Sequence, residues 1–352
     1  MKKIKFNWGQ KKYEYYSMSS LITAVFIALF FSISLSSCFK EKTLKPKQDG
    51  QHDKRIVIPM TPTYKNMYFF SLQSGAVVKE SDPALYDLMF DNISGKFSIW
   101  LNGSKLMMIK RSGKTEFEKV TYSDTLATEG WLLDKPNYDI DSNAIGKWWS
   151  DNNGSIVSQR EVYLINLGKD LLGNHLGYRK LQVESFAGNV FNIKFAFPDG
   201  SDEHTFSITQ NNFTCYRYFS FQNGGELVEI EPAKETWDIV FSRYSYVFYD
   251  PYYLPYIVVG GLSNPQRIES YVDSTVSYTD FKLTDLNNNY FSASRDVIGY
   301  DWKKYDFTEY KTSPYRIYFF KTAENQFYKL HFLDFYNEKF ERGYPTFEYE
   351  EL

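Results

Sequence analysis

The chain carries the stretch Tyr68-Phe69-Phe70-Ser71-Leu72-Gln73-Ser74-Gly75 and repeats its pattern about 150 residues later as Arg217-Tyr218-Phe219-Ser220-Phe221-Gln222-Asn223-Gly224. Each copy then passes a proline and enters an alternating stretch, Tyr86-Asp87-Leu88-Met89-Phe90 in the first copy and Trp237-Asp238-Ile239-Val240-Phe241 in the second. Apolar residues at alternate positions are typical of a β-strand. The same strand signals therefore occur twice, in the same order.

Two further pairs of blocks keep nearly the same offset. Residues 145–149 resemble residues 298–302, and residues 178–183 resemble residues 327–332. A period of about 150 residues is the size of a whole domain and too long for a solenoid repeat. The sequence predicts two related domains in tandem, residues 57–212 and residues 213–352.

The composition favours strands over helices. Aromatic residues make up 19% of the chain, with 30 Tyr and 30 Phe, and aromatic side chains suit pleated sheets. Further strands are predicted at residues 162–165, 190–195, 316–320 and 346–349. Because no long stretch keeps a helical apolar stripe, we expect an all-β protein. We expect its antiparallel sheets to pack one face and expose the other.

The first residues have the form of a bacterial lipoprotein signal. Five lysines precede an apolar run over residues 21–35, which is too short to cross a bilayer comfortably. The run ends in Leu35-Ser36-Ser37-Cys38, a lipobox that predicts cleavage of the signal peptide, residues 1–37, and lipidation of Cys38. The alternative is an uncleaved membrane anchor with a chance cysteine. Lipidation predicts attachment to a bacterial membrane through acyl chains.

Without residues 1–37, the chain has 35 basic and 42 acidic residues and a formal charge of −7. This charge argues against nucleic acid as a partner. Cys38 is predicted to carry lipid, so Cys215 has no partner for a disulfide within the chain and is interpreted as a small buried hydrophobic residue. Residues 38–56 contain the lipidated cysteine and a polar segment without apolar periodicity, which we interpret as a flexible stalk.

The order of the blocks resembles the HmuY family, haem-binding surface lipoproteins of Bacteroidetes. The resemblance includes the Trp237-Asp238-Ile239-Val240-Phe241 stretch, Ile298-Gly299 followed by Trp302, the segment from Thr322 to Leu330, and Gly343-Tyr344-Pro345-Thr346-Phe347. It is closer over residues 213–352 than over residues 57–212. In the first copy, Tyr86 stands in place of the tryptophan and the Gly-Tyr-Pro ending is absent.

The resemblance implies a compact all-β domain on the outer membrane, exposed at the cell surface. It implies haem held by two axial His or Met side chains, iron acquisition as the role, and an outer-membrane receptor as the partner. In the family, these ligands lie between the Trp-Asp-Ile strand and the Ile-Gly-x-x-Trp block. The corresponding residues 242–297 contain no His, Met or Cys. An axial pair therefore cannot be transferred to this chain, and its metal ligand is unknown.

The same interval is rich in tyrosine, and the predicted ligand-binding residues are Tyr244, Tyr246, Tyr249, Tyr252, Tyr253 and Tyr256. A tyrosinate can hold ferric haem when a cation lowers its pKa, and Arg243 and Arg267 are candidate cations. Aromatic faces also stack on planar or sugar ligands without a metal bond. The alternative is that these tyrosines are cross-strand pairs on a solvent-exposed sheet face.

Other candidate ligands are less persuasive. Met107 and Met108 are adjacent, so on a strand they point to opposite faces, and core filling is the simpler interpretation. The four histidines, His52, His175, His204 and His331, show no metal-binding spacing, and His331 is expected to face solvent. The chain also lacks the nucleophile, phosphate-loop and metalloprotease motifs of common enzymes.

The sequence thus predicts a non-catalytic, lipid-tethered outer-membrane protein that binds haem or a related porphyrin, with no other metal implied. The alternative is a surface-interaction or glycan-binding lipoprotein whose HmuY-like domains no longer bind haem. Both hypotheses place the binding surface on tyrosine-bearing loops at the rim of a β scaffold.

Overall fold

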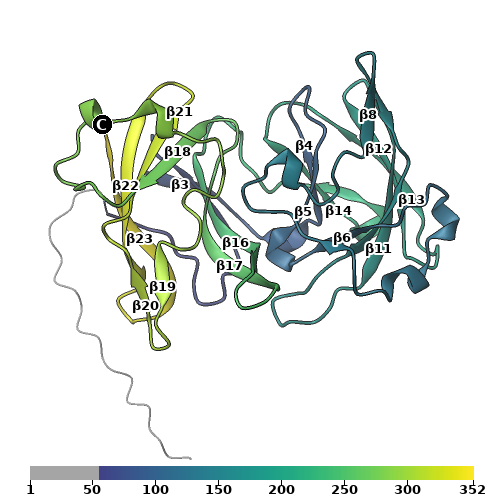
Figure 1. Ribbon diagram of the computed structural model, residues 1–352, viewed down its shortest axis with the longest axis horizontal. Helices are drawn as coiled ribbons and strands as arrows, with labels where there is room; N and C mark the ends of the chain where they lie inside the picture. The colour runs from purple at the N-terminus through teal and green to yellow at the C-terminus, as the bar shows by residue number, and fades with distance from the viewer. Residues whose placement is uncertain (1–54) are drawn as a thin grey trace, which may run out of the picture. The chain divides into compact units, whose positions relative to one another are not determined.

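The computed structural model describes residues 55–352 as strands joined by turns and short 3-10 helices (Figure 1). This confirms the predicted all-β class. The signal peptide, Cys38 and almost all of the stalk lie outside the described residues. Within residues 55–352, no helix is long and apolar enough to span a membrane. The 3-10 helices are η1 (Pro83–Leu85), η2 (Gly103–Lys105), η3 (Phe117–Lys119), η4 (Tyr122–Thr125), η5 (Ile140–Ser142), η6 (Gln222–Gly224), η7 (Leu283–Asp285) and η8 (Asn288–Tyr290).

Four antiparallel sheets form the framework. Sheet I has the order β13 (His204–Thr209), β12 (Val190–Ala196), β11 (Tyr178–Ala187), β10 (Val162–Asn166), β6 (Met108–Arg111), β7 (Trp131–Leu132). Sheet II has the order β15 (Glu226–Val228), β14 (Tyr216–Ser220), β4 (Leu88–Asp91), β5 (Ile99–Leu101).

Sheet III has the order β17 (Leu254–Ser263), β16 (Ile239–Phe248), β2 (Met67–Ser71), β3 (Ala76–Ser81). Sheet IV has the order β1 (Arg55–Val57), β23 (Arg342–Glu351), β22 (Phe327–Tyr336), β21 (Ile317–Thr322), β18 (Ile268–Asp273). Two separate hairpins are β8 (Trp149–Asn152) with β9 (Ser155–Ser158), and β19 (Lys303–Tyr305) with β20 (Tyr310–Thr312).

Strand pairing crosses the boundary that the repeat predicts. The first copy of the repeated motif forms β2, which pairs with β16 so that Phe70 faces Ile239. The second copy forms β14, which pairs with β4 so that Phe219 faces Leu88. In Figure 1, β3 from the amino-terminal part accordingly lies among strands of the carboxy-terminal half. The division of the chain at residues 212 and 213 stays a prediction from the repeat, and the sheets do not follow it.

Equivalent hydrogen bonds hold the β2–β3 hairpin beside β16 and the β14–β15 hairpin beside β4. The Asp238 carboxylate accepts the Leu72 N–H at 2.7 Å, and the Asp87 carboxylate accepts the Phe221 N–H at 2.8 Å. Each carboxylate also has a cationic partner. Arg267 lies 3.2 Å from Asp238, and Lys105 lies 2.8 Å from Asp87. The aspartate of each alternating stretch therefore anchors the turn of the other copy's motif.

Strand alternation places most of the buried aromatic residues in three cores, and two smaller clusters contain Phe117 and Phe319. Core I joins sheets I and II through Leu88, Phe90, Phe191, Phe195 and Phe219. Core II joins sheets III and IV through Phe70, Ile239, Phe241, Phe320 and Phe347. The central core joins sheets II and III through Met67, Phe69, Met89, Trp100, Tyr216, Tyr218 and Val240. Consecutive residues such as Phe69 and Phe70 thus enter different cores.

The expectation of one exposed face per sheet is wrong for sheets II and III. Asp87, Asp238 and Ser242, the polar residues that alternate with apolar ones in these strands, are all buried. Both faces of β2, β4, β14 and β16 are covered because the sheets pack against each other as well as against sheets I and IV.

The pairing predicts that a fragment of residues 82–228 folds, because it contains every strand of sheets I and II. A fragment of residues 57–212 should not reach the same structure, because it lacks β14 and β15 and leaves β4 paired with β5 alone. Near-ultraviolet circular dichroism and urea unfolding compare the two fragments. A transition as cooperative for residues 57–212 as for residues 82–228 would contradict this pairing.

Candidate functional site

The six predicted tyrosines lie on the hairpin of β16 and β17. Tyr244 and Tyr246 belong to β16, Tyr256 belongs to β17, and the other three lie in the turn between the strands. Tyr246 is directly opposite Tyr256, so the register brings two of the predicted residues together. Gly260 and Gly261 lie inside β17. Gly261 makes a bridge with Gly299 there, and a Cβ on Gly260 would meet the Gly299 carbonyl at 2.0 Å.

Tyr244 is part of the central core and is only 4% exposed. Its hydroxyl has no hydrogen-bond partner among the described residues. Burial raises the pKa of Tyr244 well above its usual value, with smaller contributions from Asp296 and Asp301. A phenolate at this position is therefore strongly disfavoured.

Tyr246 is half-buried and packs against the central core. Its ring lies 4.8 Å from Tyr300 and 5.1 Å from Phe248, between centroids. Burial also raises the pKa of Tyr300, and the nearby Tyr246 adds to this rise. These three rings support the turn.

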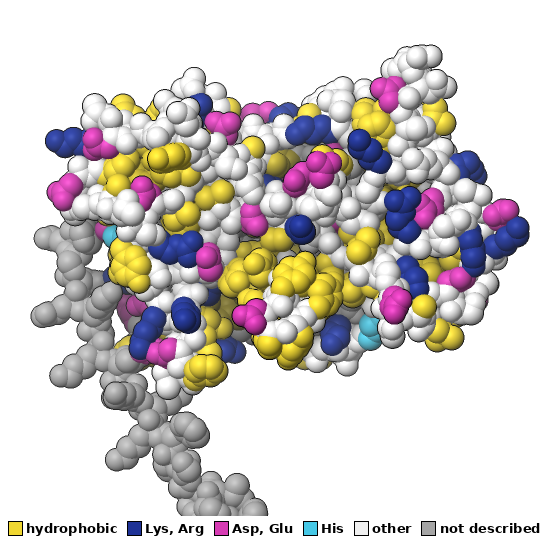
Figure 2. All heavy atoms as spheres, viewed as in Figure 1, with side chains coloured by type: hydrophobic (Ala, Val, Ile, Leu, Met, Phe, Trp, Pro, Cys, Tyr) yellow, Lys and Arg dark blue, Asp and Glu magenta, His cyan; other side chains and the backbone are white. Residues whose placement is uncertain are grey.

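The remaining four tyrosines are exposed. The exposed fractions are 68% for Tyr249, 63% for Tyr252, 52% for Tyr253 and 56% for Tyr256, and Leu254 is also exposed. We call these five residues the tyrosine surface. Figure 2 shows hydrophobic side chains gathered over the end of this hairpin. An exposed apolar group of this kind is typical of a contact site for a ligand or partner.

The neighbouring hairpin β19–β20 presents further aromatic rings. Burial raises the pKa of Tyr310, Arg342 opposes this rise, and nearby Tyr256 adds to it. The Tyr310 ring is 5.0 Å from Tyr305, which in turn is 6.3 Å from Phe307. Phe307 is 92% exposed. Exposed rings therefore continue from one hairpin to the next.

The predicted cations do not accompany the exposed phenols. Arg267 binds the carboxylates of Asp238 and Glu324. Arg243 projects from β16 on the face opposite to Tyr244, and burial lowers the pKa of Arg243, with Asp82 and Tyr86 opposing the change. Neither arginine is placed to lower the pKa of an exposed tyrosine. The six tyrosines thus do not fit the requirements of an iron–phenolate bond.

The other candidate ligands have structural roles. Met107 is buried in core I. His331 is not the solvent-facing residue that was expected. Its ring stacks on Tyr278 at 4.0 Å and hydrogen-bonds Glu348 and the Pro314 carbonyl. Throughout residues 55–352, no group of three or more His, Cys, Asp or Glu side chains is arranged to hold a metal ion.

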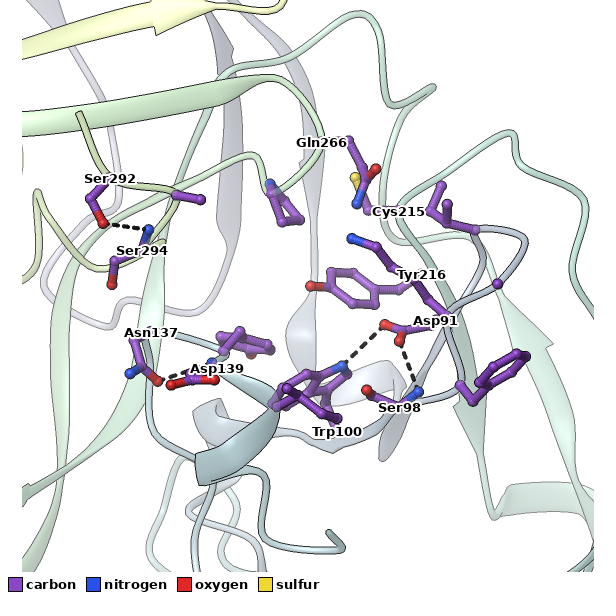
Figure 3. A pocket seen from close by; sticks show the side chains of 18 of the residues that line it. Asp91, Ser98, Trp100, Asn137, Asp139, Cys215, Tyr216, Gln266, Ser292 and Ser294 are labelled. Atoms are coloured by element: carbon purple, nitrogen blue, oxygen red, sulfur yellow. Dashed lines mark hydrogen bonds between the residues drawn. The ribbon is translucent and has the colours of Figure 1, made fainter. Parts of the chain in front are cut away.

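Sequence reasoning missed a cavity of about 720 Å³. Figure 3 shows Asp91, Trp100, Tyr216, Gln266 and Ser294 around it. The Asp91 carboxylate accepts the Trp100 indole N–H at 3.2 Å and the Ser98 backbone N–H at 2.8 Å. Burial raises the pKa of Asp91, and these hydrogen bonds oppose the rise.

Aromatic rings form one wall of the cavity. The Trp100 and Tyr138 rings lie 4.8 Å apart, and Tyr138 and Tyr216 lie 6.2 Å apart. Behind this wall, the buried Arg295 guanidinium lies 4.3 Å from the Tyr138 ring and donates a hydrogen bond to the Ser263 carbonyl. The lining comes from six separated parts of the chain, and no motif in the sequence indicated it.

Replacing Tyr244 by Phe should raise the free energy of unfolding by about 1 kcal/mol, because the change removes a buried hydroxyl without a partner. Urea unfolding measures the difference. Tyr252→Phe is the matched control, and its exposed hydroxyl should make the change neutral. A loss of stability in Tyr244→Phe would show that the hydroxyl has a partner.

Lys303 makes a pH-dependent contact with β17. Its ammonium donates to the Val259 carbonyl at 2.6 Å and lies 4.2 Å from the Trp302 ring. Burial lowers the pKa of Lys303 to about 7, against 10.5 when unfolded. Between pH 7 and pH 10.5, Lys303 is protonated in the unfolded chain but mostly neutral in the folded protein, so the free energy of unfolding rises with pH. Below pH 7 the folded protein also carries the buried charge, and the full cost of burying it applies.

The variant Lys303→Met should therefore lose a slope of up to about 1.4 kcal/mol per pH unit above pH 7. Urea unfolding at several pH values measures this slope. The exposed neighbour Lys304 provides the control variant, Lys304→Met. Equal slopes in Lys303→Met and the unmodified protein would mean that Lys303 remains charged in the folded state.

Comparison with known proteins gives a family for part of the chain. The family model described as HmuY protein matches residues 262–349, whereas no curated protein matches the chain. A crystal structure of the apo HmuY analog of Tannerella forsythia is 11% identical, covers 84% of this chain and 94% of its own, and has a TM-score of 0.21. A putative lipoprotein from Bacteroides fragilis is 10% identical, covers 85% and 92%, and has a TM-score of 0.20. Within the chain, residues 262–349 are therefore similar to the HmuY family.

Proposed function

We propose that the protein is a lipid-anchored, non-catalytic binding protein of the outer membrane that takes up haem or a related porphyrin by stacking on exposed aromatic rings. Cys38 carries the anchor, and the cell surface is the proposed location. An outer-membrane receptor is the proposed partner, in keeping with the HmuY likeness of residues 262–349. The ligand contacts the tyrosine surface without a bond from a protein side chain to iron.

The observation that carries this proposal is the exposure of four tyrosyl rings on one hairpin end, each more than half accessible. A flat apolar ligand would cover this surface and remove its rings from water. Tyr249 and Tyr253 already pack edge to face, with centroids 5.9 Å apart, so part of the surface is ordered before binding. Buried Tyr244 supports the hairpin and makes no contact with the ligand.

Titration of residues 56–352 with ferric haem and with iron-free protoporphyrin tests the proposal. Both ligands should bind with similar affinity at micromolar protein, because no side chain coordinates iron. The double change Tyr252→Ser and Tyr253→Ser should weaken both about tenfold, since each lost stacking contact is worth about 0.5–1.5 kcal/mol. Tyr122→Ser, an exposed tyrosine in η4, is the control.

Two results would contradict the proposal. The first is the absence of any Soret shift with either ligand. The second is strong binding of haem alone with a phenolate charge-transfer band, which would require an iron ligand. The first result would favour the alternative function, in which the same exposed rings contact another envelope protein.

A further inference from the structure

The cavity beside Trp100 is distinct from the tyrosine surface and shares no residue with it. Its volume of about 720 Å³ falls within the range of about 300–1,000 Å³ that small-ligand sites occupy. We propose that this cavity binds one or two rings of a neutral hexose sugar. The inference goes beyond the proposed function and does not depend on it.

The first support is a fixed aromatic wall. Trp100 is 4% exposed and Tyr216 is 5% exposed, so packing holds both rings in place. Arg295 lies over Tyr138 at 4.3 Å and over Tyr216 at 5.6 Å and holds these rings from behind. Phe97 and Trp149, which also line the cavity, are half-buried, and the apolar C–H face of a pyranose stacks on the ring surface that they expose. Because the wall is ordered beforehand, little entropy is lost on binding.

The second support is a set of polar groups with unused hydrogen-bonding capacity. The Asp91 carboxylate uses two of its roughly four acceptor positions for Trp100 and Ser98. The side-chain amide of Gln266 and the amide nitrogen of Asn137 have no hydrogen-bond partner among the described residues. Ser294 donates its hydroxyl to Asp296 and can still accept a hydrogen bond. Hydroxyl groups of a sugar, which both donate and accept, match this mixture.

The third support is the charge of the lining. Asp91 and Asp139 are acidic, and Lys96 is the one cation in the lining. This balance disfavours an anionic ligand, including a uronic acid or the propionates of a porphyrin. A dry planar ligand would also leave Asp91, Asn137 and Gln266 without partners. A neutral polyhydroxylated ring satisfies these groups and covers the wall.

The full chain in detergent is titrated with maltose, cellobiose and lactose at millimolar concentration, with calorimetry and tryptophan fluorescence as readouts. At least one disaccharide should bind saturably. Gln266→Ala should weaken binding about tenfold, the effect of about 1.4 kcal/mol. Gln266→Trp should abolish binding by filling the cavity, and Asp91→Asn should also weaken it.

Trp100→Ala is not needed as a test, because Trp100 belongs to the central core and its loss endangers folding. Gln73→Trp, at an exposed glutamine, controls for added bulk. Saturable binding by none of the three sugars would overturn the proposal. Unchanged binding in Gln266→Trp would overturn it too, as would loss of sugar binding in the Tyr252→Ser and Tyr253→Ser variant. Haem binding is measured separately and tests the other surface.

Discussion

The carboxylates of Asp87 and Asp238 each accept a backbone N–H from a hairpin distant in sequence, 134 residues away for Phe221 and 166 residues away for Leu72. A hydrogen bond to a charged group contributes about 1.5–3 kcal/mol, but its structural effect here is larger than its energy. It fixes the turn of one repeated motif beside the alternating strand of the other copy. Sheets II and III, the central core and both candidate sites depend on this arrangement.

An asparagine further along the chain from each aspartate, Asn102 after Asp87 and Asn264 after Asp238, forms hydrogen bonds with nearby backbone carbonyls. Asn264 donates its amide to the carbonyls of Lys234 and Trp237, and Asn102 donates to those of Pro83 and Tyr86. Backbone groups that would be buried without partners are satisfied in this way. The side chains of Asp87, Asn102, Asp238 and Asn264 thus form hydrogen bonds with buried backbone groups. This explains why these polar residues lie inside the protein.

Local pattern predicted the strands of this protein well, but not their partners. The alternation in the segment that became the start of β16 correctly indicated a strand, because side-chain direction depends only on neighbouring residues. Pairing of β2 with β16 depends on contacts across most of the chain, and a single sequence does not contain that information. The same limit explains the error about exposed faces. From the sequence alone, Asp238 is expected at the surface. In the fold it is buried, because the Leu72 N–H and the Arg267 guanidinium bind its carboxylate.

The candidate site was likewise predicted only in part from the sequence. The sequence singled out the tyrosines of one hairpin, but their spacing did not separate buried Tyr244 from exposed Tyr252. That difference comes from Val240 and Val258, which pack with Tyr244 in the central core. The cavity beside Trp100 could not be predicted, because its lining combines Trp149 with residues from the segments 91–100, 137–140, 215–216, 265–266 and 292–294.

The pairing of the β2–β3 and β14–β15 hairpins with strands distant in sequence affects how the chain reaches its native state. The edge of β2 that pairs with β16 has no partner until residues 239–241 are available. Loop closure over such distances is slow, and contacts of high sequence separation delay the transition state. During synthesis, the first β-hairpin therefore emerges well ahead of the strand that completes it. Its aromatic edge has to be kept from pairing with other molecules throughout that interval.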